Sequence, residues 1–356
     1  MRILIVKVSS LGDVIHTLPA VTDAKRANRD LIFDWVVEEN FIEIPAWHPA
    51  VDVVIPVAIR RWRRNWAKTY FRGEVGKFKK HLQNVHYDLV IDAQGLIKSG
   101  IVSRLSKGLT IGLSNRTIKE PLATLFYNKV YSIPWSEHAV DRIRELFSNA
   151  LKYKYDKDHV DYGLDFKRIG IKKDEPKEKQ LVFLHGTTWK TKLWPDNYWK
   201  QLAEIATTAG YKVLLPWGNE SEREKADLIA DNDNDVIVLP KQSLTGLARY
   251  IAKSTGVIAV DTGLGHLAAA LSVPILSLYG PTDPGLSGTF GQSQMHLKAN
   301  FSCAPCMKKV CAYSGPGITD EFHGESFLVS PPCFSTQNPE SVWKKFNQLI
   351  NDSGDE

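Results

Sequence analysis

The sequence predicts an α/β protein made of two doubly wound domains. Short apolar runs alternate with helix-like stretches, and one charged segment near the middle of the chain interrupts this alternation. Such alternation is typical of parallel sheets that helices cover on both faces. The chain has 356 residues, which is more than one hydrophobic core usually covers. We therefore expect two cores, with functional loops at the carboxyl ends of both sheets and a cleft between them.

The first domain is expected over residues 1–165. The apolar run at 3–8 predicts a buried strand, and a helical pattern follows it through about Arg26. The same two patterns predict further strands at 31–37, 51–57, 87–93 and 109–113, and helices at 96–107 and 137–151.

A linker is expected at 166–180, because this segment is charged and has little apolar content. The second domain then covers 181–356. Its predicted strands are 181–184, 212–215, 236–239, 257–260 and 274–278, and its predicted helices are 196–209, 221–230, 243–253 and 264–272. Residues 300–332 are rich in Gly and Pro and predict irregular structure. A last helix is expected at about 339–350, where it could pack back on the first domain.

The composition excludes a disordered or membrane-spanning chain. Hydrophobic residues make up 43% and charged residues 24%, which is typical of globular proteins. No apolar run approaches the roughly 18 residues of a membrane span, and Lys7 and Asp13 interrupt the first one. Four cysteines in a chain this long do not make a disulfide framework. We expect a cytoplasmic protein.

The strand–turn–helix pattern at 257–271 predicts an anion site, because the first amides of a helix have no partners within it. Asp261 and Thr262 could cap this helix or bind a ligand, Gly263 lets a phosphate approach, and His266 lies in the first turn. An ordinary capped helix is the alternative. A dinucleotide-binding fingerprint fits weakly, since three or more strands precede it and the histidine would crowd a pyrophosphate.

Three other residues lie on loops where ligands bind in such folds. Asp13 follows the first strand and, taken alone, is most simply a carboxylate at a helix start, where negative charge is favourable. Lys192 lies near Thr187 and Thr188, which suits a diphosphate clamp. Glu222 occupies a place from which an acidic residue binds ribose hydroxyls, with Glu220 and Glu224 as alternatives.

The region 59–80 concentrates positive charge, with nine basic residues against Glu74, and the aromatic residues Trp62, Trp66, Tyr70 and Phe71 lie among them. A solvated helix and a single-stranded nucleic-acid site are alternatives. The region follows the strand at 51–57, so its start lies at the ligand edge of the predicted sheet, and we favour binding of an anionic ligand there. Its basic residues are Arg60, Arg61, Arg63, Arg64, Lys68, Arg72, Lys77, Lys79 and Lys80.

The four cysteines, Cys303, Cys306, Cys311 and Cys333, could form a zinc or iron–sulfur site. Their spacing does not match common zinc modules, so we favour free thiols.

Taken together, these motifs resemble those of bacterial lipopolysaccharide heptosyltransferases, which are two-domain inverting transferases of the GT-B type. The similarity covers nearly the whole chain and is greatest to the heptosyltransferase I group of the inner core. It is carried by Lys7–Pro19, Trp35–Glu39, Ile55–Arg63, Ile91–Leu96, Leu215–Gly218, Asp261–His266 and Tyr279–Pro284. The cysteine region instead resembles the second and third heptosyltransferases.

The resemblance implies transfer of heptose from ADP-heptose to a Kdo residue of Kdo-lipid A, at the inner leaflet of the cytoplasmic membrane and without a metal, another cofactor or nucleic acid. It implies that Asp13 is the general base, that Thr187, Thr188 and Lys192 bind the diphosphate, that Glu222 binds the ribose, and that Asp261, Thr262, Gly263 and His266 bind the heptose and phosphates. For the acceptor we expect contacts from Lys7, Ser10, Gln94, Arg60, Arg61, Arg63 and Arg64. The alternatives are an enzyme that adds heptose to a heptosylated core and a non-catalytic nucleotide-sugar-binding protein.

Overall fold

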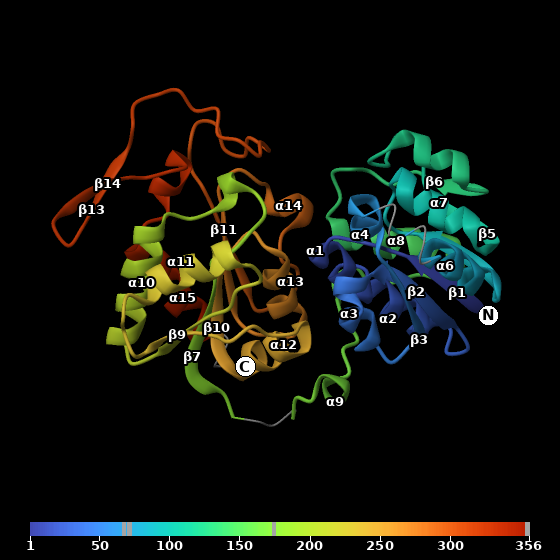
Figure 1. Ribbon diagram of the computed structural model, residues 1–356, viewed down its shortest axis with the longest axis horizontal. Helices are drawn as coiled ribbons and strands as arrows, with labels where there is room; N and C mark the ends of the chain where they lie inside the picture. Colours follow the sequence, from blue (N-terminus) through green and yellow to red (C-terminus); the bar gives the residue numbers. More distant parts are fainter. Residues whose placement is uncertain (66–68, 70–72, 173–175, 353–356) are drawn as a thin grey trace. The chain divides into compact units, whose positions relative to one another are not determined.

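The computed structural model describes residues 1–356 except 66–68, 70–72, 173–175 and 353–356. The chain forms two compact units, Met1–Arg168 and Ile169–Glu356, coloured blue to green and green to red in Figure 1. The division falls inside the segment 166–180, for which the sequence predicts a linker. Residues 173–175 of that segment lie outside the described residues, and a strand already begins at Glu178.

The first unit is built on a six-stranded parallel sheet in the order β3-β2-β1-β4-β5-β6. The central strand β1 pairs with β2 on one side and with β4 on the other, and its residues Ile3 to Val6 are fully buried. Burial on both faces explains why the sequence of this strand is an unbroken apolar run. The strands are β1 (Arg2–Val6), β2 (Ile32–Glu38), β3 (Val51–Val57), β4 (His86–Asp92), β5 (Lys107–Leu113) and β6 (Lys129–Tyr131).

The helices of the first unit include two short ones where the sequence predicts a single helix ending near Arg26. Pro19 lacks the N–H group that would bond the carbonyl of Ile15, and its ring clashes with that carbonyl, so the first helix stops at Ile15 and a new one begins at Leu18. Among the residues that the structure describes, the helices of this part of the chain are α1 (Leu11–Ile15), α2 (Leu18–Ala27), α3 (Glu43–Ala46), α4 (Ile59–Arg64), α6 (Glu74–Gln83), α7 (Ile97–Leu105), α8 (Ala139–Leu151) and α9 (Phe166–Ile169), with 3₁₀ turns η1 (Glu39–Phe41) and η2 (Pro121–Phe126).

The second unit repeats the strand order of the first. Its parallel sheet runs β12-β11-β10-β7-β8-β9, so its first strand again lies between its second and its fourth. The strands are β7 (Glu178–Leu184), β8 (Lys212–Leu215), β9 (Val236–Val238), β10 (Ser254–Val260), β11 (Ile275–Tyr279) and β12 (Gln294–Lys298). This repeated order is that of the doubly wound folds that bind nucleotides.

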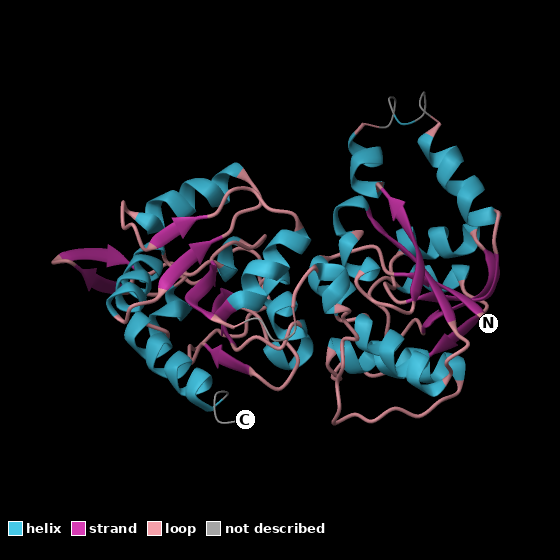
Figure 2. Ribbon diagram, turned by 90° about the horizontal axis from the view of Figure 1, so that it is seen from below, coloured by secondary structure: helices cyan, strands magenta, loops and turns pink. Residues whose placement is uncertain are grey.

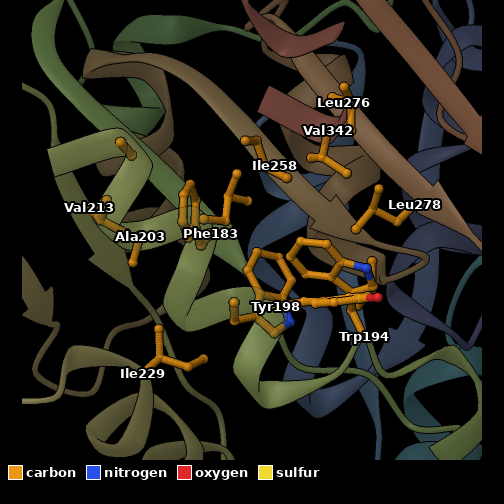
Figure 3. Packing of buried hydrophobic residues seen from close by; sticks show 14 of the residues in the cluster. Phe183, Trp194, Tyr198, Ala203, Val213, Ile229, Ile258, Leu276, Leu278 and Val342 are labelled. Carbon is orange, nitrogen blue, oxygen red and sulfur yellow. The ribbon is translucent and has the colours of Figure 1, made fainter. Parts of the chain in front are cut away.

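An aromatic cluster fills the core beside this second sheet (Figure 3). The ring of Trp194 lies 5.0 Å from that of Trp199 and 5.2 Å from that of Tyr198, and all three side chains are essentially buried. The helices of the unit are α10 (Asp196–Thr208), α11 (Glu220–Ala230), α12 (Leu244–Lys253), α13 (Gly263–Ala270), α14 (Pro284–Ser287) and α15 (Pro339–Asp352), with 3₁₀ turns η3 (Lys190–Lys192) and η4 (Pro332–Thr336). Among the described residues, no helix has the length and apolar character needed to span a bilayer.

The last helix, α15, buries its apolar face within the second unit. Val342, Phe346 and Leu349 recur at helical spacing and join the core of that unit, where α15 contacts α10 and the strands β10 to β12. The sequence allowed instead that this helix packs back on the first domain. In the structure its apolar stripe packs into the core of the second unit.

The region 300–332, which the sequence predicts to be irregular, contains a hairpin of β13 (Thr319–Phe322) and β14 (Glu325–Leu328). His323 and Gly324 form its two-residue turn with φ of 51° and 79°, as a type I′ turn requires. Figures 1 and 2 show that this hairpin projects from the body of the second unit.

Candidate active site

Each unit places polar side chains at the carboxyl ends of its two central strands. In doubly wound sheets, ligands bind where the strand order reverses, because the loops on either side of that point diverge. The reversal lies between β1 and β4 in the first unit and between β7 and β10 in the second. The loops that follow these four strands carry most of the residues selected from the sequence.

In the first unit, Asp13 lies in the first turn of α1 and is held from two directions. The backbone N–H and the hydroxyl of Ser10 both donate to Asp13 Oδ2 at 2.7 Å. The ammonium of Lys7 lies 3.8 Å from Asp13 Oδ1. The Lys7 side chain is only 6% exposed, whereas that of Asp13 is 43% exposed. The carboxylate is therefore fixed in position and still accessible.

The electrostatic surroundings keep Asp13 ionised. Burial raises the pKa of this carboxyl, but the charge of Lys7 and the two hydrogen bonds from Ser10 outweigh burial and hold the pKa below its ordinary value. Burial lowers the pKa of Lys7, and the nearby carboxylates Asp13 and Asp92 oppose that shift. An ionised, accessible carboxylate can accept a proton from a substrate hydroxyl.

The neighbouring loop after β4 shapes the backbone that leads to Asp13. Gln94 Oε1 accepts the N–H groups of Val8 at 3.0 Å and Ser9 at 2.9 Å. Lys7 donates to the carbonyl of Ala93 at 2.7 Å. The sequence assigns Lys7, Ser10 and Gln94 to the acceptor. In the structure these polar groups hold the loop after β1 that carries Asp13, and their contact with an acceptor stays a prediction.

Sequence reasoning missed Lys98 at this site. Its ammonium donates to Ser9 Oγ at 3.4 Å, which places a cation beside the loop that carries Asp13. The signal for it was its position just past the carboxyl end of a predicted strand.

The arginines of α4 divide into one that is engaged and three that are available. Arg61 pairs with Glu39 at 3.0 Å and with Glu74 at 2.8 Å. With the residues that the structure describes, Arg60, Arg63 and Arg64 form no ion pair, and all three are exposed. Five other members of the predicted basic and aromatic region lie outside the described residues: Trp66, Lys68, Tyr70, Phe71 and Arg72.

In the second unit, a short ion pair joins the loops after β7 and β10. The ammonium of Lys192 lies 2.6 Å from Asp261 Oδ2, with side chains 16% and 10% exposed. Thr282 donates to the same Asp261 oxygen at 2.7 Å, and the hydroxyl of Thr187 donates to the Asp261 carbonyl at 2.9 Å. These contacts fix a cation directly before the start of α13.

Helix α13 adds backbone donors to this cation. It begins at Gly263, and the hydroxyl of the preceding residue, Thr262, makes no capping hydrogen bond. His266 is buried in the first turn. The first amides of a helix, next to a lysine, form an anion-binding arrangement suited to a diphosphate.

The structure distinguishes Glu222 from its two sequence rivals. Glu222 Oε2 accepts the N–H of Gly218 at 2.8 Å, and a Cβ atom at Gly186 would lie 2.8 Å from the Glu222 carboxyl carbon. Glu222 therefore packs against the loop that carries Thr187 and the exposed Thr188. The Glu220 side chain is 74% exposed and lies near Arg223, and Glu224 is exposed.

The two weaker sequence patterns are the dinucleotide fingerprint and the four cysteines. Asp283 lies about 20 residues past Gly263, where the dinucleotide fingerprint expects an acidic residue. It accepts the N–H of Gly285 at 3.0 Å and caps α14. Burial, together with the other cysteines, raises the pKa of the Cys333 thiol to about 12. In the described part of the chain, His, Cys, Asp and Glu side chains form no group of three or more suited to a metal. The four cysteines are Cys303 and Cys311, which are exposed, Cys306, which is partly buried, and Cys333, which is buried.

Comparison with known proteins connects these features. Residues 75–315 match the family described as glycosyltransferase family 9 (heptosyltransferase). The chain is 52% identical over 351 residues to lipopolysaccharide heptosyltransferase 1 of Pseudomonas aeruginosa, covering 98% of both chains. It is 48% identical over 300 residues to the Escherichia coli K12 protein of the same name, covering 84% of this chain and 94% of that one.

Solved structures agree with this similarity. The structure of E. coli heptosyltransferase WaaC with ADP matches with a TM-score of 0.79 at 48% identity, covering 84% of this chain and 93% of that one. WaaC with ADP-2-deoxy-2-fluoro heptose matches with a TM-score of 0.77 at 46% identity, with the same coverage. E. coli heptosyltransferase II, at 18% identity over 99% of this chain and 100% of that one, matches with a TM-score of 0.70 and shares the fold. The predicted two-domain GT-B architecture is confirmed.

The geometry at Asp13 predicts that Lys7 sets its pKa. Lys7→Met keeps the length of the buried side chain and removes its charge, so the pKa of Asp13 should rise. We expect this rise in a ¹³C NMR titration of the Asp13 carboxyl, assigned by comparison with Asp13→Asn. Because the folded-state pKa is lowered, the stabilisation from this carboxylate is complete above the unfolded-state pKa and is lost as pH falls through the folded-state pKa. Lys107→Met, at the exposed start of β5, is the matched control. An unchanged Asp13 titration in Lys7→Met would contradict the assignment.

Proposed function

Because the chain belongs to glycosyltransferase family 9, the heptosyltransferases, we propose that it transfers L-glycero-D-manno-heptose from ADP-heptose to a Kdo residue of Kdo-lipid A. Heptose transfer in synthesis of the lipopolysaccharide inner core is its general activity, given relatives of that name at 47 to 52% identity. The observation that carries the proposal within the molecule is the Lys192–Asp261 pair at the start of α13, where a nucleotide diphosphate would bind.

The sequence motifs indicate two different acceptors, since most resemble heptosyltransferase I and the cysteine region resembles the second and third heptosyltransferases. Four relatives named heptosyltransferase 1 match between 83 and 98% of this chain at 47 to 52% identity, and a fifth, from Campylobacter coli, matches 99% of it at 27% identity. Those named heptosyltransferase 2 match about a quarter of it, 26% in each case. This difference supports Kdo, and not a heptosylated core, as the acceptor. The ionised and accessible Asp13 supports an enzyme over a non-catalytic binding protein.

Donor binding, in our proposal, replaces one anion by another at Lys192. The ammonium that pairs with Asp261 turns to the diphosphate, while the first amides of α13 donate to the same phosphates. Thr187 and Thr188 lie on the loop beside them, and Glu222 takes the ribose hydroxyls. Asp261, released from Lys192, joins Thr262, Gly263 and His266 around the heptose.

The reaction is a single displacement. A hydroxyl oxygen of Kdo attacks the anomeric carbon of the heptose, Asp13 accepts the hydroxyl proton, and the bond between the anomeric carbon and the phosphate oxygen breaks. ADP leaves with the electron pair of that bond, so the configuration at the anomeric carbon inverts. Lys192 and the α13 amides stabilise the charge that develops on the leaving phosphate. We propose that they do so without a metal.

The acceptor carries lipid-linked phosphates and Kdo carboxylates, which match the exposed guanidinium groups of α4. Guanidinium groups bind such anions bidentately. Each basic residue near an anionic bilayer contributes about 1 kcal/mol, so α4 also supports peripheral contact with the inner leaflet of the cytoplasmic membrane. No nucleic acid is needed to explain this charge.

The proposed function is tested by mass spectrometry of reactions with ADP-heptose and defined acceptors. We expect one heptose to be added to Kdo-lipid A and none to an acceptor that already carries the first heptose. Turnover should persist in EDTA, because protein cations and amides neutralise the diphosphate. Transfer only to the heptosylated acceptor would contradict the acceptor assignment, and loss of turnover in EDTA with recovery on adding Mg²⁺ would contradict the donor site.

Asp13→Asn should lower kcat by about 10²-fold or more, since general-base catalysis typically contributes at least this factor. The amide keeps the size of the side chain but cannot take up the proton. The affinity for ADP should stay near the wild-type value, as measured by calorimetry. A variant that turns over at the wild-type rate would remove Asp13 from the mechanism.

Arg63→Ala with Arg64→Ala should raise the KM for Kdo-lipid A several-fold and leave the KM for ADP-heptose nearly unchanged. Steady-state kinetics at two salt concentrations measures both, and the wild-type acceptor KM should rise with salt because screening shortens to about 8 Å near physiological ionic strength. Arg104→Ala, in α7, serves as a control of the same residue type. An equal rise in both KM values would argue against acceptor binding by α4.

A further inference from the structure

The segment 303–311, here called the cysteine segment, is attached to the loop after β7 and to the loop after β11, which contacts Asp261 through Thr282. The hydroxyl of Thr191, beside Lys192, donates to the carbonyl of Lys308 at 2.7 Å. The N–H of Met307 donates to the carbonyl of Pro281 at 2.8 Å, next to the threonine that binds Asp261. Backbone groups of Met307 and Lys308 therefore fix the cysteine segment at the donor site, although it lies more than a hundred positions after Lys192 in the sequence.

This attachment places Lys309 beside Lys192 on one aromatic side chain. The ammonium of Lys192 lies 4.6 Å from the centroid of the Trp189 ring, and that of Lys309 lies 5.4 Å from the same centroid. The two ammonium groups can be no farther apart than these two distances combined. An indole face attracts cations, but two like charges around one ring also repel each other, and an anion between them would remove that repulsion.

The two lysines differ in what neutralises them. Lys192 is paired with Asp261 at 2.6 Å, so this pair contributes no net charge. Lys309 is exposed and has no acidic partner among the residues that the structure describes. It supplies uncompensated positive charge at the place where the donor phosphates arrive.

We propose that Lys309 is a second cation of the donor site and binds the diphosphate of the nucleotide, with Trp189 holding its ammonium near Lys192. The inference rests on the proposed use of ADP-heptose and adds a residue to that site. The phosphates can bind Lys192 only when its ion pair with Asp261 breaks. They can bind Lys309 without breaking an ion pair. The cysteine segment thus becomes part of the donor site.

The test is calorimetric binding of ADP to the full-length protein. Lys309→Ala should weaken ADP binding by about 3- to 10-fold, which is less than a buried charge-assisted contact typically contributes because this side chain is exposed. Lys309→Arg should restore most of the affinity, because it keeps the charge. Lys308→Ala is the matched control, since it removes a neighbouring exposed lysine and keeps the carbonyl that Thr191 binds. Its ADP affinity should stay within about twofold of wild type, a margin of about 0.4 kcal/mol.

In steady-state assays, Lys309→Ala should raise the KM for ADP-heptose by a similar factor with little change in kcat. Unchanged ADP affinity in Lys309→Ala would overturn the proposal, as would an equal loss in Lys308→Ala, which would indicate a diffuse basic surface. Failure of the wild-type protein to transfer heptose would overturn the proposed function, and the ADP measurement would still decide whether Lys309 binds a diphosphate.

Discussion

The reversal of strand order at the centre of each sheet is the constraint on which both candidate sites depend. Neighbouring parallel strands that continue into diverging loops leave backbone amides and polar side chains without sheet partners at one edge. Each unit fills this place with a lysine held near a carboxylate: Lys7 lies 3.8 Å from Asp13, and Lys192 lies 2.6 Å from Asp261. In our proposal, the pair of the first unit serves the acceptor and the pair of the second unit serves the donor.

Burial gives the two pairs different chemistry. In the first unit the lysine is almost buried and the carboxylate is accessible, so the lysine keeps the carboxylate ionised and leaves an oxygen available for a proton. In the second unit both side chains are largely buried, and Thr282 also holds the carboxylate. Separating a buried pair without a replacement leaves an uncompensated charge and costs several kcal/mol, so an anionic ligand has to take the place of Asp261. This requirement favours a diphosphate over a neutral ligand.

The sequence predicted the elements whose pattern is local and missed contacts that only folding creates. The buried strands beside both sites were recognisable as apolar runs, whereas β6 and β12 lie at sheet edges, are only partly buried and lack that pattern. The sequence selected Glu222 and left Glu220 and Glu224 as alternatives, and the packing of Glu222 against Gly186 separates it from them. Lys309 had no local signal, because its relation to Trp189 arises from hydrogen bonds between segments far apart in the chain.

The central claim is that the donor diphosphate takes Lys192 from Asp261, and ADP binding to Asp261→Asn tests it most directly. ADP has no heptose, so its affinity reports on the phosphates alone, and the asparagine keeps an oxygen that can accept from Thr282. The account predicts that Asp261→Asn binds ADP more tightly than wild type, because Lys192 no longer has to leave a carboxylate, and that adding Lys192→Ala abolishes the gain. Weaker or unchanged ADP affinity in Asp261→Asn would contradict the exchange.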